Sequence, residues 1–226
     1  MLNRAETLEQ LARLCRREGA MPPAIHATGS PQLDAVLPHG GWPSGTIVEL
    51  MPTQIGVGEF RLLMPALASI TNTERHAALI APPYIPFAPA LARHGIRLER
   101  LLVVRAAKNA DVLWAFEQTL RCKSFGAVVA WPEAIKDRDV RRLQLAAEAG
   151  RSVGFLYRST FAALETSPAA MRLKLCPASD GGLHIDILKC RGIRSGQTVM
   201  ISPPSSANPI STSALPKSDQ SLIASH

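Results

Sequence analysis

The segment from Thr53 to Phe60 has the spacing of a phosphate-binding loop but lacks its chemistry. The pattern G-x-x-x-x-G-K-[ST] uses its lysine to hold the β- and γ-phosphates of a nucleotide and its hydroxyl group to hold Mg²⁺. With Gly58 aligned to the second glycine, Thr53 replaces the first glycine. Glu59 then replaces the lysine, and Phe60 replaces the hydroxyl residue. Because a carboxylate repels a triphosphate, we interpret this loop, with Gly56 inside it, as degenerate and expect no cofactor.

A second part of a nucleotide site is also missing. In nucleotide-hydrolysing proteins a second strand supplies an aspartate for Mg²⁺. The corresponding apolar run at 125–131 ends in Ala130 and Trp131, and Glu133 follows only after a proline. We therefore predict no nucleotide hydrolysis, unless Lys189, Arg191 or a partner supplies the missing positive charge for a weak activity.

Other catalytic motifs are absent from the sequence. The six histidines show no H-E-x-x-H spacing, and the chain has no G-x-S-x-G sequence. Glu49, on the strand before the degenerate loop, could act as a general base, but we favour the interpretation that it orders the loop behind it. We accordingly predict no catalytic residue and a protein that is not an enzyme.

Short apolar runs alternate with amphipathic segments on both sides of the loop. This alternation predicts a mostly parallel sheet flanked by helices, an α/β fold. We expect Asn109 to cap one helix, and Thr28 or Ser30 to cap a short helix near 33–37. The expected strands are 46–51, 76–82, 101–106, 125–131 and 152–158, and the expected helices are 59–71, 86–95, 109–121 and 138–149.

The ends of the chain have a different character. Segments 171–177 and 183–190 alternate apolar and polar residues around Asp180-Gly181-Gly182, which predicts a C-terminal antiparallel hairpin. Residues 194–226 are rich in serine and proline and are expected to form a disordered tail. Residues 1–23 are predicted to form an amphipathic helix and a linker, and the helix packs either on its own core or on a neighbouring molecule. The remaining residues, 24–193, form the predicted domain.

Two segments are candidates for contact with a partner. The proline-rich segment 81–89 (APPYIPFAP) carries Tyr84 and Phe87, which either pack into the core or form a rigid apolar contact for another protein. The turn after the hairpin carries Lys189 and Arg191, which form either a solvated basic turn or part of an interface.

The bulk composition excludes several classes. Of 226 residues, 46% are hydrophobic and 19% charged, as in ordinary globular proteins. The net charge of +7 is compatible with an acidic partner or a weak DNA contact, although the arginines are scattered. The four cysteines are too widely spaced for a zinc site or a disulfide framework. No apolar run reaches about 18 residues and the N-terminus does not have the pattern of a signal peptide, so we expect a soluble cytoplasmic protein without a membrane partner.

Several segments resemble known proteins. Residues 26–37 (HATGSPQLDAVL) and 40–50 (GGWPSGTIVEL) resemble the approach to the nucleotide site in the RecA-like core. Lys189-Cys190-Arg191-Gly192 is similar to the K-N-R-x-G turn of that superfamily, with cysteine in place of asparagine. Within the resemblance, which covers about 24–193, three further segments are similar to the ImuA family: 58–63, 81–90 and 141–148.

This resemblance implies a RecA-like fold and a role in DNA damage. ImuA proteins are accessory proteins of damage-inducible (SOS) mutagenesis and translesion DNA synthesis, a form of error-prone DNA repair. The implied partners are a polymerase-like protein of the ImuB type, an error-prone replicative-type polymerase and RecA. SulA proteins share the degenerate RecA-like ancestry, so an inhibitor of cell division that binds the division GTPase is the alternative.

Overall fold

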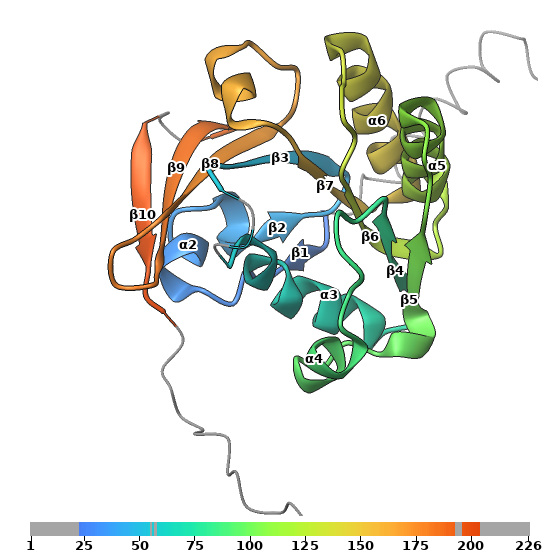
Figure 1. The fold of residues 1–226 in the computed structure, drawn as a ribbon, viewed down its shortest axis with the longest axis horizontal. Helices are drawn as coiled ribbons and strands as arrows, with labels where there is room; N and C mark the ends of the chain where they lie inside the picture. The colour runs from blue at the N-terminus through green and yellow to red at the C-terminus, as the bar shows by residue number, and fades with distance from the viewer. Residues whose placement is uncertain (1–22, 55, 57, 193–195, 204–226) are drawn as a thin grey trace, which may run out of the picture.

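Strand β3 (Thr46–Pro52), which precedes the degenerate loop, lies inside an eight-stranded sheet (Figure 1). The computed structural model describes residues 23–54, 56, 58–192 and 196–203. In the strand order β10-β9-β8-β3-β7-β6-β4-β5, β8 to β5 are parallel neighbours, whereas β8, β9 and β10 pair antiparallel. The remaining strands of this sheet are β4 (His76–Ile80), β5 (Leu101–Val104), β6 (Phe125–Ala130), β7 (Val153–Tyr157), β8 (Met171–Pro177), β9 (Leu183–Cys190) and β10 (Gln197–Ile201).

Helices cover both faces of the sheet (Figure 1). One face packs against α5 (Asn109–Arg121) and α6 (Asp137–Gly150). The opposite face packs against the other helices and a small sheet. Those elements are α2 (Pro31–Asp34), α3 (Met64–Thr71), α4 (Ala88–Arg93) and the paired strands β1 (Ile25–His26) and β2 (Trp42–Pro43). Short 3-10 helices lie at η1 (Pro38–Gly40), η2 (Glu59–Leu62), η3 (Leu98–Arg100) and η4 (Thr160–Leu164).

The core is divided by the sheet into two apolar clusters. Successive side chains of a strand point to opposite faces, so Ile47 packs with α5 and α6 while Val48 packs on the α3 side. On the α3 side, the ring of Trp42 meets that of Phe155 edge to face, with centroids 5.5 Å apart. Strand β3 is therefore buried on both faces, as expected for the central strand of an α/β fold.

The predicted α/β architecture is confirmed: a mostly parallel sheet flanked by helices, with a C-terminal antiparallel hairpin. The RecA-like core that the resemblance implies stays a prediction. The bounds of α5, β8 and β9 coincide with the predicted segments, and the other strands differ by a few residues at their ends. The predicted helix at 59–71 is divided into η2 and α3, because Pro65 lacks an N–H group and is favoured in a first helical turn.

The prediction for the segment after residue 194 differs from the structure. The segment after residue 194 was expected to be a disordered tail, yet β10 pairs with β9 there and buries Val199. Strand β10 has five residues, of which Val199 alone is strongly buried, so its sequence shows no clear alternation of apolar and polar residues. Residues 1–22 and 204–226, which include the predicted N-terminal helix and most of the predicted tail, lie outside the described residues.

The prediction that Asn109 caps α5 is wrong, although Ser30 does cap α2 by accepting a hydrogen bond from the N–H group of Leu33. The N-cap position of α5 belongs to Lys108, and Asn109 is the first helical residue. Its side chain accepts a hydrogen bond from the N–H group of Glu133 at 3.0 Å and donates one to the carbonyl of Ala134 at 2.7 Å. Asn109 therefore holds the loop after β6 against the start of α5.

Acid should destabilise the fold through His26, whose Nε2 lies 3.1 Å from Oγ of Ser44. Burial and, to a smaller extent, the charge of Arg75 lower the pKa of His26 from 6.5. Just below pH 6.5 His26 binds a proton in the unfolded chain but not in the folded chain. The contribution of His26 to the free energy of unfolding is therefore fully present above that pH and is lost as the pH decreases. The contribution of one group is at most about 1.4 kcal/mol per pH unit.

The measurement is urea unfolding between about pH 5 and 8 for the wild type and for His26→Gln. The variant should show a shallower loss of stability toward acid, because the other titrating groups are common to both proteins. Identical slopes would contradict the assignment to His26.

Candidate functional site

The candidate site lies where the parallel strands β3, β4, β6 and β7 end, which is where α/β sheets carry their ligand sites. The degenerate loop follows β3, and the proline-rich segment follows β4. Within the degenerate loop, Gly56 and Gly58 have φ angles of +87° and +91°, in the left-handed region that favours glycine. Gly56 and Gly58 therefore have backbone conformations typical of turns, just before η2.

The carboxylate of Glu59 is hydrogen-bonded to the backbone of this loop. Its Oε1 accepts a hydrogen bond from the backbone N–H group of Gly56 at 3.0 Å, and its side chain is buried. Backbone N–H groups of such loops are the groups that hold phosphate in nucleotide-binding proteins. Here one of them binds the chain's own carboxylate instead.

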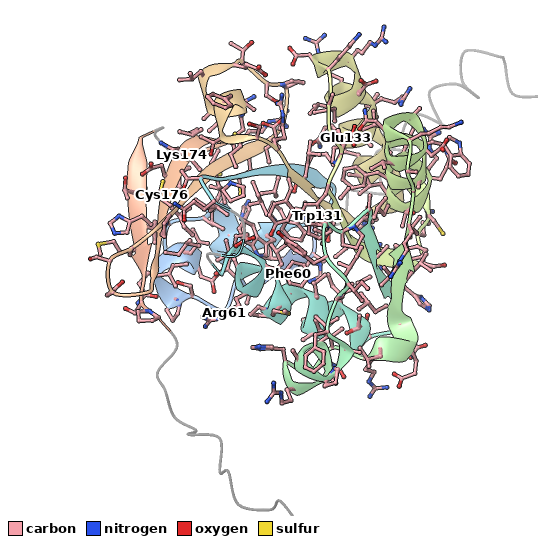
Figure 2. The ribbon with its side chains drawn as sticks, viewed as in Figure 1. Phe60, Arg61, Trp131, Glu133, Lys174 and Cys176 are labelled. Carbon is pink, nitrogen blue, oxygen red and sulfur yellow. The ribbon has the colours of Figure 1, made fainter. Side chains whose placement is uncertain are left out.

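Three aromatic residues line one pocket together with Glu59. Trp131, just after β6, stacks on Tyr157 at the end of β7, with ring centroids 4.8 Å apart and planes at 11°. Phe60 turns toward the same tryptophan, at a centroid distance of 6.1 Å and a tilt of 39° (Figure 2). Phe60, Trp131 and Tyr157 therefore form one aromatic group beside the loop.

Two polar atoms beside these rings are buried without a hydrogen-bond partner in the described part of the chain: Oε2 of Glu59 and the hydroxyl group of Tyr157. Burial, followed by the charge of Glu59, raises the pKa of Tyr157 well above its usual value. The phenol is therefore neutral at physiological pH.

Two pockets lie on this edge and share Glu59, Trp131 and Tyr157 as lining residues. The first, of about 330 Å³, lies between the degenerate loop and the proline-rich segment, and its lining includes Pro83 and Ile85. The second, of about 420 Å³, extends toward the residues that follow β7.

The proline-rich segment presents its large apolar side chains to solvent. Tyr84, Ile85 and Phe87 are 71%, 78% and 66% exposed. The interpretation that Tyr84 and Phe87 pack into the core is therefore wrong, and the alternative of a rigid apolar contact stays open. Contiguous exposed apolar side chains of this kind mark contact surfaces more often than chance positions do.

Glu49 lies behind the degenerate loop in a buried ionic cluster. Its side chain is fully buried, and its carboxylate accepts hydrogen bonds from Arg158 at 3.0 Å, Arg172 at 2.7 Å and Ser167 at 2.6 Å. Arg172 also donates to the carbonyls of Ala162 and Glu165 in the connection between β7 and β8. Both oxygens of Glu49 are therefore engaged in a structural role, and the segment that Glu49 orders is the connection between β7 and β8 rather than the degenerate loop.

The basic turn does not join the pockets. Lys189 donates a hydrogen bond from Nζ to the carbonyl of Ser167 at 2.8 Å, which ties it to the cluster around Glu49. Arg191 is exposed. Neither residue lines the two pockets beside Glu59, and Thr53 lines only the second of them. Glu133 is exposed and also lies outside both linings.

Sequence reasoning missed Tyr157, Arg158 and Arg172. A usable signal existed for Tyr157, because the last residues of parallel strands meet at one edge of the sheet. Within the described ranges, no three histidine, cysteine or acidic side chains are grouped as a metal site would require. Nor does any described helix combine the length and the apolar character needed to cross a membrane.

Comparisons with known proteins find two related groups. A family model described as "Cell division inhibitor SulA" matches residues 45–154. Protein ImuA of Caulobacter vibrioides is 27% identical over 204 residues, which cover 79% of this chain and 84% of the relative. SulA of Photorhabdus laumondii is 27% identical over 115 residues, covering 51% of this chain and 65% of the relative.

Other SulA proteins show the same partial overlap. SulA of Edwardsiella piscicida is 30% identical over 95 residues, covering 42% of this chain and 56% of the relative. This chain thus spans less than two thirds of the length of either SulA relative. The crystal structure of SulA from Pseudomonas aeruginosa is similar with a TM-score of 0.42 and 28% identity, over 50% of this chain and 97% of that one.

Proposed function

We propose that this chain, which is related to the ImuA and SulA proteins, is a non-catalytic accessory protein of damage-induced mutagenesis. The observation that carries the proposal is the extent of the similarity. The ImuA relative aligns with most of both chains, whereas the SulA family model covers only residues 45–154. The ImuA alignment therefore accounts for more of this chain than the SulA similarity does.

The degenerate loop supports a RecA-like ancestry without nucleotide chemistry. The segment from β3 through the glycine-containing loop into η2 has the order of a phosphate-binding unit. Glu59 holds the N–H group of Gly56, and Trp131 stands where the second strand would bring an aspartate. A weak activity supplied by Lys189 or Arg191 is not favoured, because neither residue lines the pockets beside the loop. Binding of ATP in calorimetry, with or without a partner, would contradict this part of the proposal.

The proposed mode of action is contact with other proteins. We assign the contact to the exposed segment that carries Tyr84, Ile85 and Phe87. Its prolines limit the backbone freedom lost on binding, and aromatic side chains dominate the affinity of many interfaces. The proposed direct partner is the polymerase-like protein of the ImuB type, with the error-prone polymerase and RecA in the same assembly.

A deletion experiment tests the function. Loss of the gene should lower the frequency of ultraviolet-induced mutations, and the protein should co-purify with an ImuB-type partner from damaged cells. Unchanged induced mutagenesis together with no co-purification would overturn the proposal.

The SulA family match supports a second candidate, an inhibitor of cell division. Overexpression separates the two functions. Filamentous cells with blocked division rings would favour the second candidate, and normal division would favour the first.

The double substitution Tyr84→Ser, Phe87→Ser should weaken binding to the ImuB-type partner at least about tenfold, because exposed aromatics of an interface carry much of its affinity. Its effect on folding should be small, since both side chains are mostly exposed. The matched control is Trp114→Ser on α5, where an aromatic ring is 64% exposed in a different element. Calorimetry with the purified partner measures both. Equal losses for the control, or no loss for the double variant, would contradict the assignment.

A further inference from the structure

The pocket between the degenerate loop and the proline-rich segment is lined by one buried carboxylate, Glu59, and by one exposed cation, Arg61. Glu59 is only 8% exposed, and its Oε1 is held by the N–H group of Gly56, while its Oε2 has no partner among the described residues. Glu59 forms no ion pair with any described lysine or arginine. A buried carboxylate of this kind is costly unless a donor, preferably a cation, meets it.

A second unpartnered acceptor lies beside it. The hydroxyl group of Tyr157, a residue only 6% exposed, has no hydrogen-bond partner in the described ranges, and its ring lines the same pocket as Glu59. A phenol can accept one hydrogen bond while a carboxylate oxygen accepts another. The two groups therefore suit a ligand that carries several donors on one rigid head.

The walls of the pocket suit a flat cation. Trp131 is stacked on Tyr157, and Phe60 is tilted toward the same tryptophan. The faces of such rings attract a cation, and a guanidinium group also stacks on them through its plane. Leu79, Pro83 and Ile85 also line the pocket and can cover the apolar stem of a long side chain.

From these contacts we propose that the pocket binds an arginine side chain presented by a partner protein, where a nucleotide-binding relative would hold phosphate. The buried and unpartnered Oε2 of Glu59 repels phosphate, whereas the charge of Arg61, the cation of the lining, belongs to an exposed residue and is screened by solvent. Arginine is favoured over lysine because its guanidinium group is planar and carries more N–H donors, whereas the ammonium group of lysine is a compact and strongly hydrated charge. Only the choice of a protein as the occupant rests on the proposed function.

The neighbouring apolar surface supports a protein as the source of the arginine. Tyr84 and Ile85 line the mouth of the pocket and are mostly exposed, so a segment with an arginine among apolar residues would cover them while its guanidinium enters. The arginine would act as the central buried contact, and the proline-rich segment would form the surrounding surface.

The test uses the full chain and acetyl-arginine methylamide as the probe. The readout is the indole N–H resonance of Trp131 in a ¹H–¹⁵N spectrum, assigned with Trp131→Phe. The arginine probe should shift this resonance in a saturable manner. The uncharged isostere acetyl-citrulline methylamide and inorganic phosphate should bind at least about tenfold more weakly, since hydrogen bonds to charged groups are the stronger ones.

Two variants and one control locate the binding. Glu59→Gln keeps the acceptor for Gly56 and should weaken the arginine probe about tenfold. Tyr157→Phe, which keeps the ring and removes only the hydroxyl group, should weaken it a few-fold even if Glu59→Gln proves unstable. Glu133→Gln removes an exposed carboxylate at the same edge and should change nothing.

Four outcomes would overturn the proposal: no saturable shift with arginine, equal affinity for citrulline, tighter binding of phosphate, or unchanged affinity in both variants. A Trp131 shift produced by protein concentration alone would show a second copy in the pocket and would also overturn it. The titration needs no partner, so its failure leaves the mutagenesis assay unaffected. Failure of that assay likewise leaves the measured affinity for arginine intact.

Discussion

Replacing Glu49 with glutamine should lower the free energy of unfolding by about 3–5 kcal/mol. Glu49 is fully buried and receives hydrogen bonds from both Arg158 and Arg172. The variant leaves the guanidinium of Arg172, a residue only 5% exposed, without a compensating charge. Removal of one partner from a buried ion pair has this large effect because the remaining charge cannot regain its hydration. Urea unfolding measures the change.

The control is Glu74→Gln, which removes the carboxylate that pairs with Arg100 at 3.2 Å. The side chain of Glu74 is 96% exposed, so this substitution should cost less than about 1 kcal/mol. A double variant, Glu49→Leu with Arg172→Met, should recover part of the lost stability, since it removes the buried charge along with its partner. A small effect of Glu49→Gln, close to that of Glu74→Gln, would show that the buried cluster does not depend on its charges.

The order of the elements could be predicted because their patterns are local. Strand β3 is a short apolar run between two turns, and β8 and β9 alternate apolar and polar residues around a glycine pair. Each pattern lies within about ten residues, so no knowledge of distant contacts is needed. Strand β10 is the counterexample, since only its pairing with β9 makes Val199 a core residue.

The candidate site could be predicted only in part, because it combines segments far apart in the chain. The spacing from Thr53 to Phe60 is local and identifies the degenerate loop. Trp131 and Tyr157, however, reach Glu59 through the order of β3, β7 and β6 in the sheet. Spacing along the chain contains no information on that order.

The same limit applies to the buried charges. Glu49 and Arg172 are direct neighbours in the pairing of β3 with β8, although 123 positions separate them in the sequence. Their partnership depends on the register of two parallel strands, which the sequence pattern does not specify. The exposure of Tyr84 and Phe87 was likewise open, because prolines predict a rigid segment but not the side to which its aromatics point.

Restoring the two residues of a working phosphate-binding loop should not create an ATPase. In the double variant Glu59→Lys, Phe60→Thr, the strand that should supply an aspartate still ends in Ala130 and Trp131. The substitution also removes the acceptor that holds the N–H group of Gly56 and the partly buried ring that faces Trp131. Loss of these contacts should cost about 2–4 kcal/mol, within the range for truncated aromatic residues and broken buried hydrogen bonds.

A thermal melt with and without Mg-ATP measures this outcome, and Arg61→Gln, an exposed change in the same helical turn, is the control. The double variant should have a lower melting temperature than the wild type, and the control should have the melting temperature of the wild type. Mg-ATP should change the melting temperature of none of the three proteins. The new lysine should in addition abolish the response of Trp131 to the arginine probe, since an ammonium group then occupies the place of Glu59 and repels a second cation. A midpoint of the double variant that equals that of the wild type, or that rises with Mg-ATP, would contradict this expectation. It would show that the loop can bind phosphate once Glu59 is removed.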